Sequence, residues 1–141
     1  MRLLIPCLIV LLLLLTGCSG LNTTEVQLFV DEVYDNLNNQ SYDKIVPVLD
    51  DRWLKSTNES KTIDFLSKLH NKTGVVNSYS LMSWNAKIGM AVGGRSGTTY
   101  VLGYYSNRTN MMTRDTFTIF NPMDTNDFYI MGYNVNSPDL I

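Results

Sequence analysis

Asp115 is the residue of this chain best suited to acid/base chemistry. Alternation along an expected strand, Met111 to Phe120, places its carboxylate on the same face as Phe117, pointing toward the interior. Burial raises the pKa of a carboxyl group, as general acid/base catalysis at neutral pH requires. Two other outcomes stay open: the side chain is exposed near the strand start, or it pairs with Arg108 or Arg114. Asp115 is therefore a weak candidate for a catalytic residue, assisted by nearby tyrosine hydroxyls.

The other reactive residue types lack the patterns of known sites. His70 is the only histidine, which excludes a metal site built from several imidazoles. The segment Gly93–Gly97 lacks the Gly-Lys-Ser/Thr ending of a phosphate loop and is expected to be a hairpin connection. Asp124–Asp127 lacks the spacing of a calcium loop, and Asp50-Asp51 is interpreted as turn chemistry. We therefore expect no metal and no cofactor, and a non-catalytic function is favoured.

The amino terminus has the layout of an export signal. Met1-Arg2 is a short positive region, Leu3–Leu15 is apolar throughout, and Leu15–Cys18 is a cleavage region with small residues. Thirteen residues in a helix would span about 20 Å, less than the roughly 30 Å hydrocarbon core of a bilayer, which disfavours a permanent membrane span. We expect the leader to be removed.

The sequence Leu15-Thr16-Gly17-Cys18 resembles the lipobox of bacterial lipoproteins. The resemblance implies cleavage after Gly17 and acylation of Cys18, and several acyl chains on one residue would anchor the protein durably to membrane lipid. The alternative is a plain secretory signal with a chance cysteine. Ser19 stands where lipoproteins retained at the inner membrane tend to have Asp, which favours the outer membrane and a domain facing the periplasm.

Length and composition indicate one globular domain after this leader. The chain has 141 residues, of which 45% are hydrophobic and 17% charged, and its formal net charge is −2. No basic excess is present, so nucleic acid is not expected as a partner. We divide the chain into a signal peptide (1–17), a polar tether (18–24) and a domain (25–141).

Apolar spacing predicts three helices in the first half of the domain. Residues recurring at three and four positions predict a helix from Glu25 to Leu37, capped by Asn22, with its acidic residues on a solvated face. The segment from Ser41 to Leu49 contains Pro47 and is expected to be a kinked or very short helix. The third carries Ile63, Leu66 and Leu69 and closes near Gly74.

The second half of the domain has the period of strands. Alternation and turn residues predict four strands, at Val75–Lys87, Thr98–Ser106, Met111–Phe120 and Phe128–Asn136. Helices followed by sequential strands predict an α+β fold, in which three helices pack on a curved four-stranded antiparallel meander.

Three segments carry a resemblance to a known type of domain. They are Val26–Leu49, with a break rich in Asn and Gln, Asn77–Asn85 and Ile130–Ser137. Together they resemble the small NTF2-like or cystatin-like domains found in many bacterial exported lipoproteins of unknown function. The resemblance implies a curved sheet wrapped around a helix as a cone, which can hold a ligand, an active site or nothing.

The last strand is apolar or aromatic on both faces. Alternation directs Phe128 and Ile130 to one side and Tyr129, Met131 and Tyr133 to the other. Helices cover one side of a meander, so the second side requires a loop, a second copy of the domain or a partner protein, unless strong curvature shields both faces. Tyr129, Met131 and Tyr133 are the predicted contact strip.

These observations favour a membrane-anchored binding or assembly module of the cell envelope. One alternative is a cone-type enzyme or small-ligand receptor that uses Asp115 in a polar cavity. The other is an envelope inhibitor protein. The expected partners are membrane lipid, through acylated Cys18, and a second copy or another envelope protein.

Overall fold

The computed structural model describes residues 21, 23–90 and 94–137 of the chain. Helices come first in this part: α2 (Thr24–Asn38), α3 (Tyr42–Ile45), the 3-10 helix η1 (Val46–Val48), α4 (Asp51–Ser56) and α5 (Glu59–Thr73). The strands β1 (Val76–Met90), β2 (Ser96–Arg108), β3 (Met112–Pro122) and β4 (Tyr129–Asn136) follow. The predicted α+β order of helices and then strands is confirmed.

The strands form one antiparallel sheet in the order β1-β2-β3-β4. Each strand pairs with the next one along the chain, so the sheet is a meander, as predicted. Side chains that stand opposite each other on neighbouring strands share a face. Leu102 opposite Phe117 and Tyr100 opposite Ile119 therefore define an inner face, and all four side chains are buried in the core.

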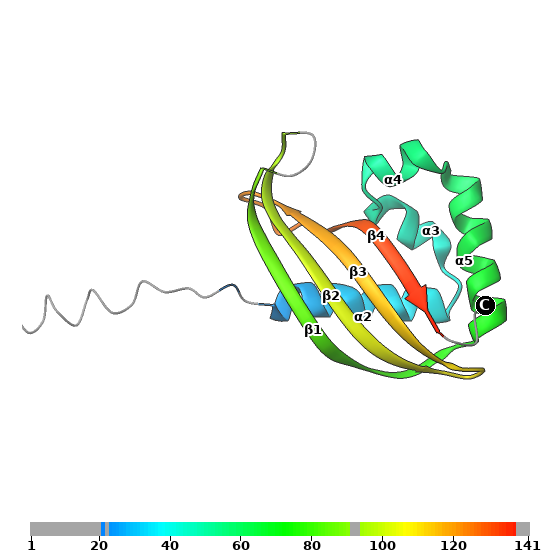
Figure 1. Ribbon diagram of the computed structural model, residues 1–141. Helices are drawn as coiled ribbons and strands as arrows, with labels where there is room; N and C mark the ends of the chain where they lie inside the picture. The colour runs from blue at the N-terminus through cyan, green and yellow to red at the C-terminus, as the bar shows by residue number, and fades with distance from the viewer. Residues whose placement is uncertain (1–20, 22, 91–93, 138–141) are drawn as a thin grey trace, which may run out of the picture.

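Helix α2 lies against this inner face. Figure 1 shows it crossing behind the sheet, while α3, α4 and α5 gather beside β4. The buried residues of α2 recur every three or four positions, at Val26, Val30, Val33 and Leu37, and they join the core of the sheet. The spacing produces one apolar stripe on the helix, which is why α2 packs with that side inward.

The connections between the helices follow local chemistry. Pro47 lies at the start of η1, and the predicted kinked or very short helix is a four-residue α-helix that continues as a 3-10 turn. Gly74 closes α5 with a φ of +79°, and a Cβ atom there would lie 2.7 Å from Thr109. Helix α4 was not predicted: Asp50-Asp51 was interpreted as turn chemistry, and the domain therefore has one more short helix than expected.

The predicted signal peptide and its cleavage site lie outside the residues that the structure describes. Gly17, Cys18 and the predicted cap Asn22 lie outside them. Within the described part of the chain, no helix is long and apolar enough to cross a membrane.

Candidate functional site

Asp115 is fully buried on the inner face of β3, which pairs with β2 on one side and with β4 on the other. Five side chains bond to its carboxylate: Arg108 Nη2 at 2.6 Å, Thr113 Oγ1 at 2.7 Å, Tyr34 OH at 3.0 Å, Ser106 Oγ at 3.2 Å and Tyr133 OH at 3.3 Å. We call these six residues, with Thr73, the Asp115 cluster. The predicted inward orientation of Asp115 is confirmed.

Arg108 neutralises Asp115 and is itself satisfied. Its guanidinium also donates to Thr113 at 3.0 Å, Thr73 at 3.1 Å and Tyr133 at 2.8 Å, and the residue is only 5% exposed. Of the two pairings left open by the sequence, the one with Arg108 is present, whereas Arg114 is exposed. A buried ion pair with this many hydrogen bonds is a structural arrangement, because both charges keep the partners that water would have supplied.

The tyrosines of the cluster are held as proton donors. Burial raises the pKa of Tyr34, and the nearby charge of Asp115 raises it further. Burial and Asp115 likewise raise the pKa of Tyr133, against the opposing effect of Arg108. Neither hydroxyl therefore ionises near neutral pH, and neither can serve as a general base.

The cavity beside Tyr133 is too small for a substrate. It has a volume of about 10 Å³ and lies between the helices and the sheet, with Val33, Leu66, Trp53 and Phe117 among its lining residues. Such a space is at most the size of one water molecule, and its lining is apolar. Among the described residues, the space beside Tyr133 is thus small and apolar, unlike the polar cavity that the cone-type alternative predicts.

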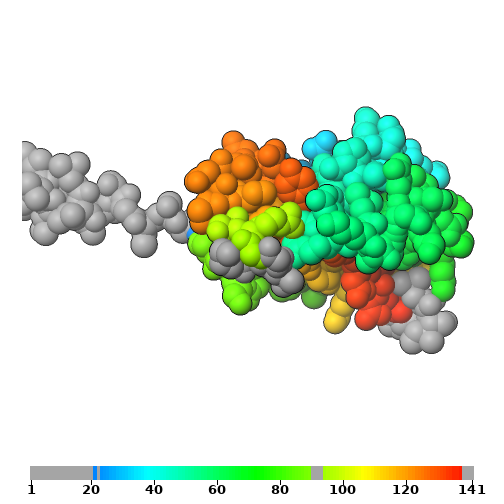
Figure 2. All heavy atoms as spheres, turned by 90° about the horizontal axis from the view of Figure 1, so that it is seen from above, coloured from blue at the N-terminus to red at the C-terminus, as the bar shows by residue number. Residues whose placement is uncertain are grey.

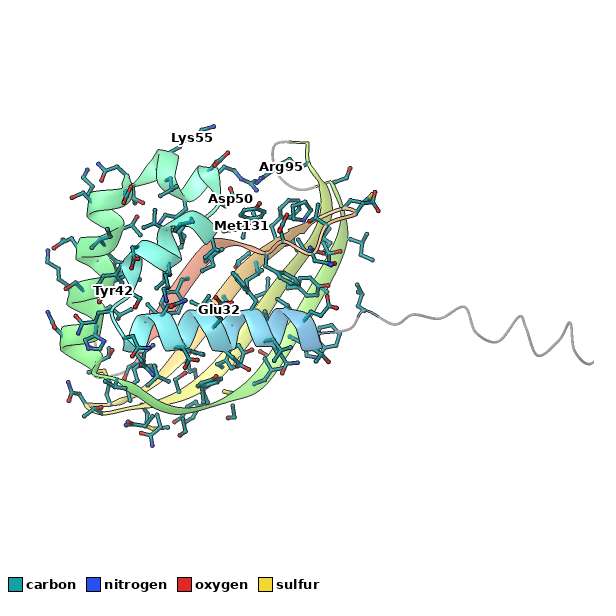
Figure 3. The ribbon with its side chains drawn as sticks, turned by 180° about the vertical axis from the view of Figure 1, so that it is seen from behind. Glu32, Tyr42, Asp50, Lys55, Arg95 and Met131 are labelled. Atoms are coloured by element: carbon teal, nitrogen blue, oxygen red, sulfur yellow. The ribbon has the colours of Figure 1, made fainter. Side chains whose placement is uncertain are left out.

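A second ionic cluster joins the helices to the β1–β2 hairpin, and we call its residues Asp50, Arg52 and Arg95 the Asp50 cluster. Asp50 is the N-cap of α4 and accepts hydrogen bonds from the Arg52 backbone N–H and Nε, each at 3.0 Å. Arg95 reaches the other carboxylate oxygen from the hairpin (Figure 3). The Arg95 guanidinium also lies over the ring of Phe120. The buried Asp50 carboxylate thus links α4 to the β1–β2 hairpin through its bonds to Arg52 and Arg95. The interpretation of Asp50 as simple turn chemistry was therefore incomplete.

These hydrogen bonds lower the pKa of Asp50. Burial alone would raise it, but hydrogen bonds from the Arg52 backbone, from Arg95 and from the Arg52 side chain outweigh burial. The net result is a pKa below the ordinary value of an aspartate. Asp50 therefore stays charged throughout the neutral range.

An open groove lies between α2, η1 and the start of β4. Its volume is about 450 Å³. We call it the α2–β4 groove, and its lining residues are Leu28, Phe29, Glu32, Pro47, Val48, Asn126, Asp127, Phe128 and Tyr129. Figure 2 shows the orange β3–β4 turn next to the cyan helical segments, with part of blue α2 between them.

The α2–β4 groove combines apolar walls with acidic groups. Leu28 is 62% exposed, a high value for a large apolar side chain. Phe29 and Phe128 pack with ring centroids 5.5 Å apart and ring planes tilted by 31°, and they connect the groove to the core. Glu32 and Asp127 are exposed carboxylates, and none of the lining residues is basic. The groove can therefore hold an apolar group and a positive charge together.

The structure does not keep the predicted contact strip on one face. In β4, Ile130 pairs with Ile119 and Gly132 pairs with Thr118, so Met131 is an extra residue in the ladder. This bulge returns Tyr133 to the inner face, and the prediction that Tyr133 and Ile130 point to opposite faces was wrong.

The three residues of the strip consequently have different surroundings. Tyr129 lines the α2–β4 groove. The sulfur of Met131 accepts a hydrogen bond of 3.7 Å from Arg52. Tyr133 stacks on Phe117 at 4.5 Å and belongs to the Asp115 cluster. Of the three, Tyr129 is the residue that lines the groove, and the contact role of Met131 and Tyr133 stays a prediction.

Three separate segments build the groove, so no single stretch of the sequence predicts it. A signal was present in Leu28, an apolar residue outside the predicted apolar stripe of α2.

Comparison with family models, curated proteins and solved structures finds no match to this chain.

Proposed function

We propose that the protein is a lipid-anchored, non-catalytic binding or assembly module of the bacterial cell envelope, which receives its partner in the α2–β4 groove. The observation that carries this proposal is the groove itself, open to solvent and lined by aromatic, aliphatic and acidic side chains. Exposed apolar surface of this kind commonly marks an interaction site. Tyr129 is the residue shared by the predicted contact strip and the groove.

The Asp115 cluster supports a non-catalytic function. A general acid or base must reach its substrate within hydrogen-bond distance. Asp115 is 0% exposed and already bonded by five side chains. A substrate would have to displace partners that stabilise the fold.

The charge of the groove favours a cationic, amphipathic partner segment. Glu32 and Asp127 would face Lys or Arg side chains, while Leu28 and Phe128 would take the apolar residues between them. Complementary charge mainly sets specificity and the rate of association, and the apolar contacts supply affinity.

A short peptide built from Leu and Lys residues, the Leu/Lys peptide, tests this proposal. The described buried residues lie between Val26 and Ser137, so the domain from Ser19 onward keeps that whole core and can be used. We expect saturable binding, weakened about tenfold or more, or 1.4 kcal/mol, by Glu32→Lys with Asp127→Lys. A Leu/Glu peptide should prefer that double variant.

The matched control is Glu59→Lys, which changes an exposed carboxylate on α5. This control should bind the Leu/Lys peptide like the wild type. Equal binding by the double variant and the wild type would reject the groove as the site.

We infer the anchor from Leu15–Cys18, and the proposed location rests on it. The protein would lose residues 1–17, carry acyl groups on Cys18 and face the periplasm, at the outer membrane. Mass spectrometry of the mature amino terminus tests this point. Cys18→Ser should release the protein from the membrane fraction, and an unmodified Cys18 in the mature chain would reject the anchor.

We also propose kinship with NTF2-like or cystatin-like domains. Helix α2 against the inner face of an antiparallel meander supports it. An experimental structure with a different course of α2 across the sheet would reject this kinship.

A further inference from the structure

Strand β1 is an edge of the sheet, and it is long. It spans 15 residues and pairs with β2, while no other described strand pairs with it. Its beginning is closed, because the side-chain amide of Asn38 bonds to both backbone groups of Val76, at 2.9 and 2.8 Å. An edge strand presents a row of backbone donors and acceptors that can pair with another chain.

The second half of β1 is the regular part of this edge. Register shifts interrupt the ladder between Val76 and Ser78 and between Leu81 and Ser83, but pairing is continuous from Ser83 to Met90. We call Ser83–Met90 the open run. Lys87 is its one charged residue. Natural edges usually carry several charges, a proline or a bulge, so this run is unusually receptive to pairing.

Two large apolar side chains of the open run are exposed on the inner face. Trp84 stands opposite Leu102 and Ile88 opposite Thr98, so both share the face on which α2 packs. Trp84 is nevertheless 49% exposed and Ile88 61% exposed. The packing of this domain leaves them at the border of the inner face.

We infer that a second copy of this chain pairs antiparallel along the open run, with the twofold axis at Ala86. In this register Trp84 lies opposite Ile88 of the second copy, and Ala86 lies opposite its own counterpart. On the outer face Asn85 lies opposite Lys87 of the second copy. The two sheets would then form one continuous sheet with the inner faces on the same side.

The open run is complementary to itself in this register, which favours a second copy over a foreign strand. Each exposed apolar residue meets an apolar residue, and the cation meets an amide. A twofold interface requires such self-complementarity. An axis at Lys87 would instead oppose two like charges, and an axis at Trp84 would bring Ile88 against the irregular segment before Ser83.

Cross-linking of the full chain in the membranes of the cells that produce it tests this register. Cysteines at directly opposed positions have Cβ atoms about 4.5–5.5 Å apart, within reach of a short bis-maleimide. Ala86→Cys is expected to give a covalent dimer. Ser80→Cys is the control on the same strand, because this residue and its counterpart would lie about 40 Å apart.

A second variant separates pairing from folding. Trp84→Lys, added to Ala86→Cys, places charges on the inner face of the run and should remove most of the dimer while leaving the circular dichroism spectrum unchanged. The dimer should persist in the Glu32→Lys/Asp127→Lys variant, because the α2–β4 groove is not part of β1. Absence of an Ala86→Cys dimer, or equal cross-linking of Ser80→Cys, would overturn the inference whether or not the groove binds a peptide.

Discussion

The Asp115 cluster and the α2–β4 groove both combine aromatic rings with carboxylates, but they use them in opposite ways. In the cluster, the side chains surrounding Asp115 satisfy its carboxylate and exclude water. In the groove, Glu32 and Asp127 remain exposed beside apolar side chains. A carboxylate that points into a fold is therefore not by itself a functional signal. Its hydrogen-bond partners decide whether it stabilises the protein or can act on another molecule.

The largest expected effect on stability concerns the Asp115 cluster. Asp115→Ala leaves the Arg108 guanidinium buried without its counter-ion, and we expect a loss of about 3–5 kcal/mol in the free energy of unfolding. Urea titration of the Ser19–Ile141 domain measures this loss. Arg108→Met combined with Asp115→Leu should recover part of it, because neither charge then remains buried. A loss below about 1 kcal/mol for Asp115→Ala would contradict a structural role.

The Asp50 cluster should be less costly to disrupt. Asp50→Ala removes the N-cap of α4 and releases two arginines that are already one-third or more exposed, so we expect a loss of about 2 kcal/mol. Arg95→Ala is the matched control, because it breaks the tie to the hairpin and leaves the N-cap in place. It should cost less than Asp50→Ala.

The Asp50 cluster also predicts a dependence on pH. The pKa of Asp50 is lower in the folded than in the unfolded state, where it is about 3.9. Its contribution to stability is therefore present above that value and disappears as the pH falls toward the folded pKa. The difference in unfolding free energy between wild type and Asp50→Asn should shrink below about pH 5. A difference that is independent of pH would contradict the lowered pKa.

Removal of one hydroxyl from the Asp115 cluster should have a modest effect on the free energy of unfolding. Tyr133→Phe deletes the group that accepts from Arg108 at 2.8 Å and donates to Asp115 at 3.3 Å, and we expect a loss of about 1 kcal/mol. Tyr129→Phe, in the same strand but at the groove, should change stability by less than about 0.5 kcal/mol. Equal losses in urea titrations would remove the distinction between the two tyrosines.

Leu28→Asp should have the smallest effect on stability and a clear effect on binding. The side chain is 62% exposed, so its replacement should change the unfolding free energy by at most about 0.5 kcal/mol. It should nevertheless weaken binding of the Leu/Lys peptide, because the groove loses an apolar contact. Unchanged affinity in a fluorescence titration would show that Leu28 is not part of the site.

The elements with a strong period could be predicted from sequence alone. The apolar stripe of α2 and the alternation in β2 and β3 report which side of each element is buried, and Asp115 followed from the same alternation. Helix α4 escaped because six residues are too few to show a period, although Asp50 before Asp51 is a typical N-terminal signal.

Features that depend on register could not be predicted. The choice between Arg108 and Arg114 as the partner of Asp115 required the pairing of β2 with β3. The orientation of Tyr133 required the bulge at Met131, where one extra residue reverses the alternation that follows. The groove required the packing of η1 and the β4 start beside α2, which no local pattern encodes.

Amide chemical shifts, recorded while the Leu/Lys peptide is added to the labelled Ser19–Ile141 domain, report on the α2–β4 groove and the Asp115 cluster in one titration. If the groove is the binding site, we expect saturable shifts at Leu28, Val48 and Phe128, with the amides of Asp115 and Arg108 unchanged. Shifts centred on Asp115, or a titration that leaves the groove amides unmoved, would contradict that role of the groove.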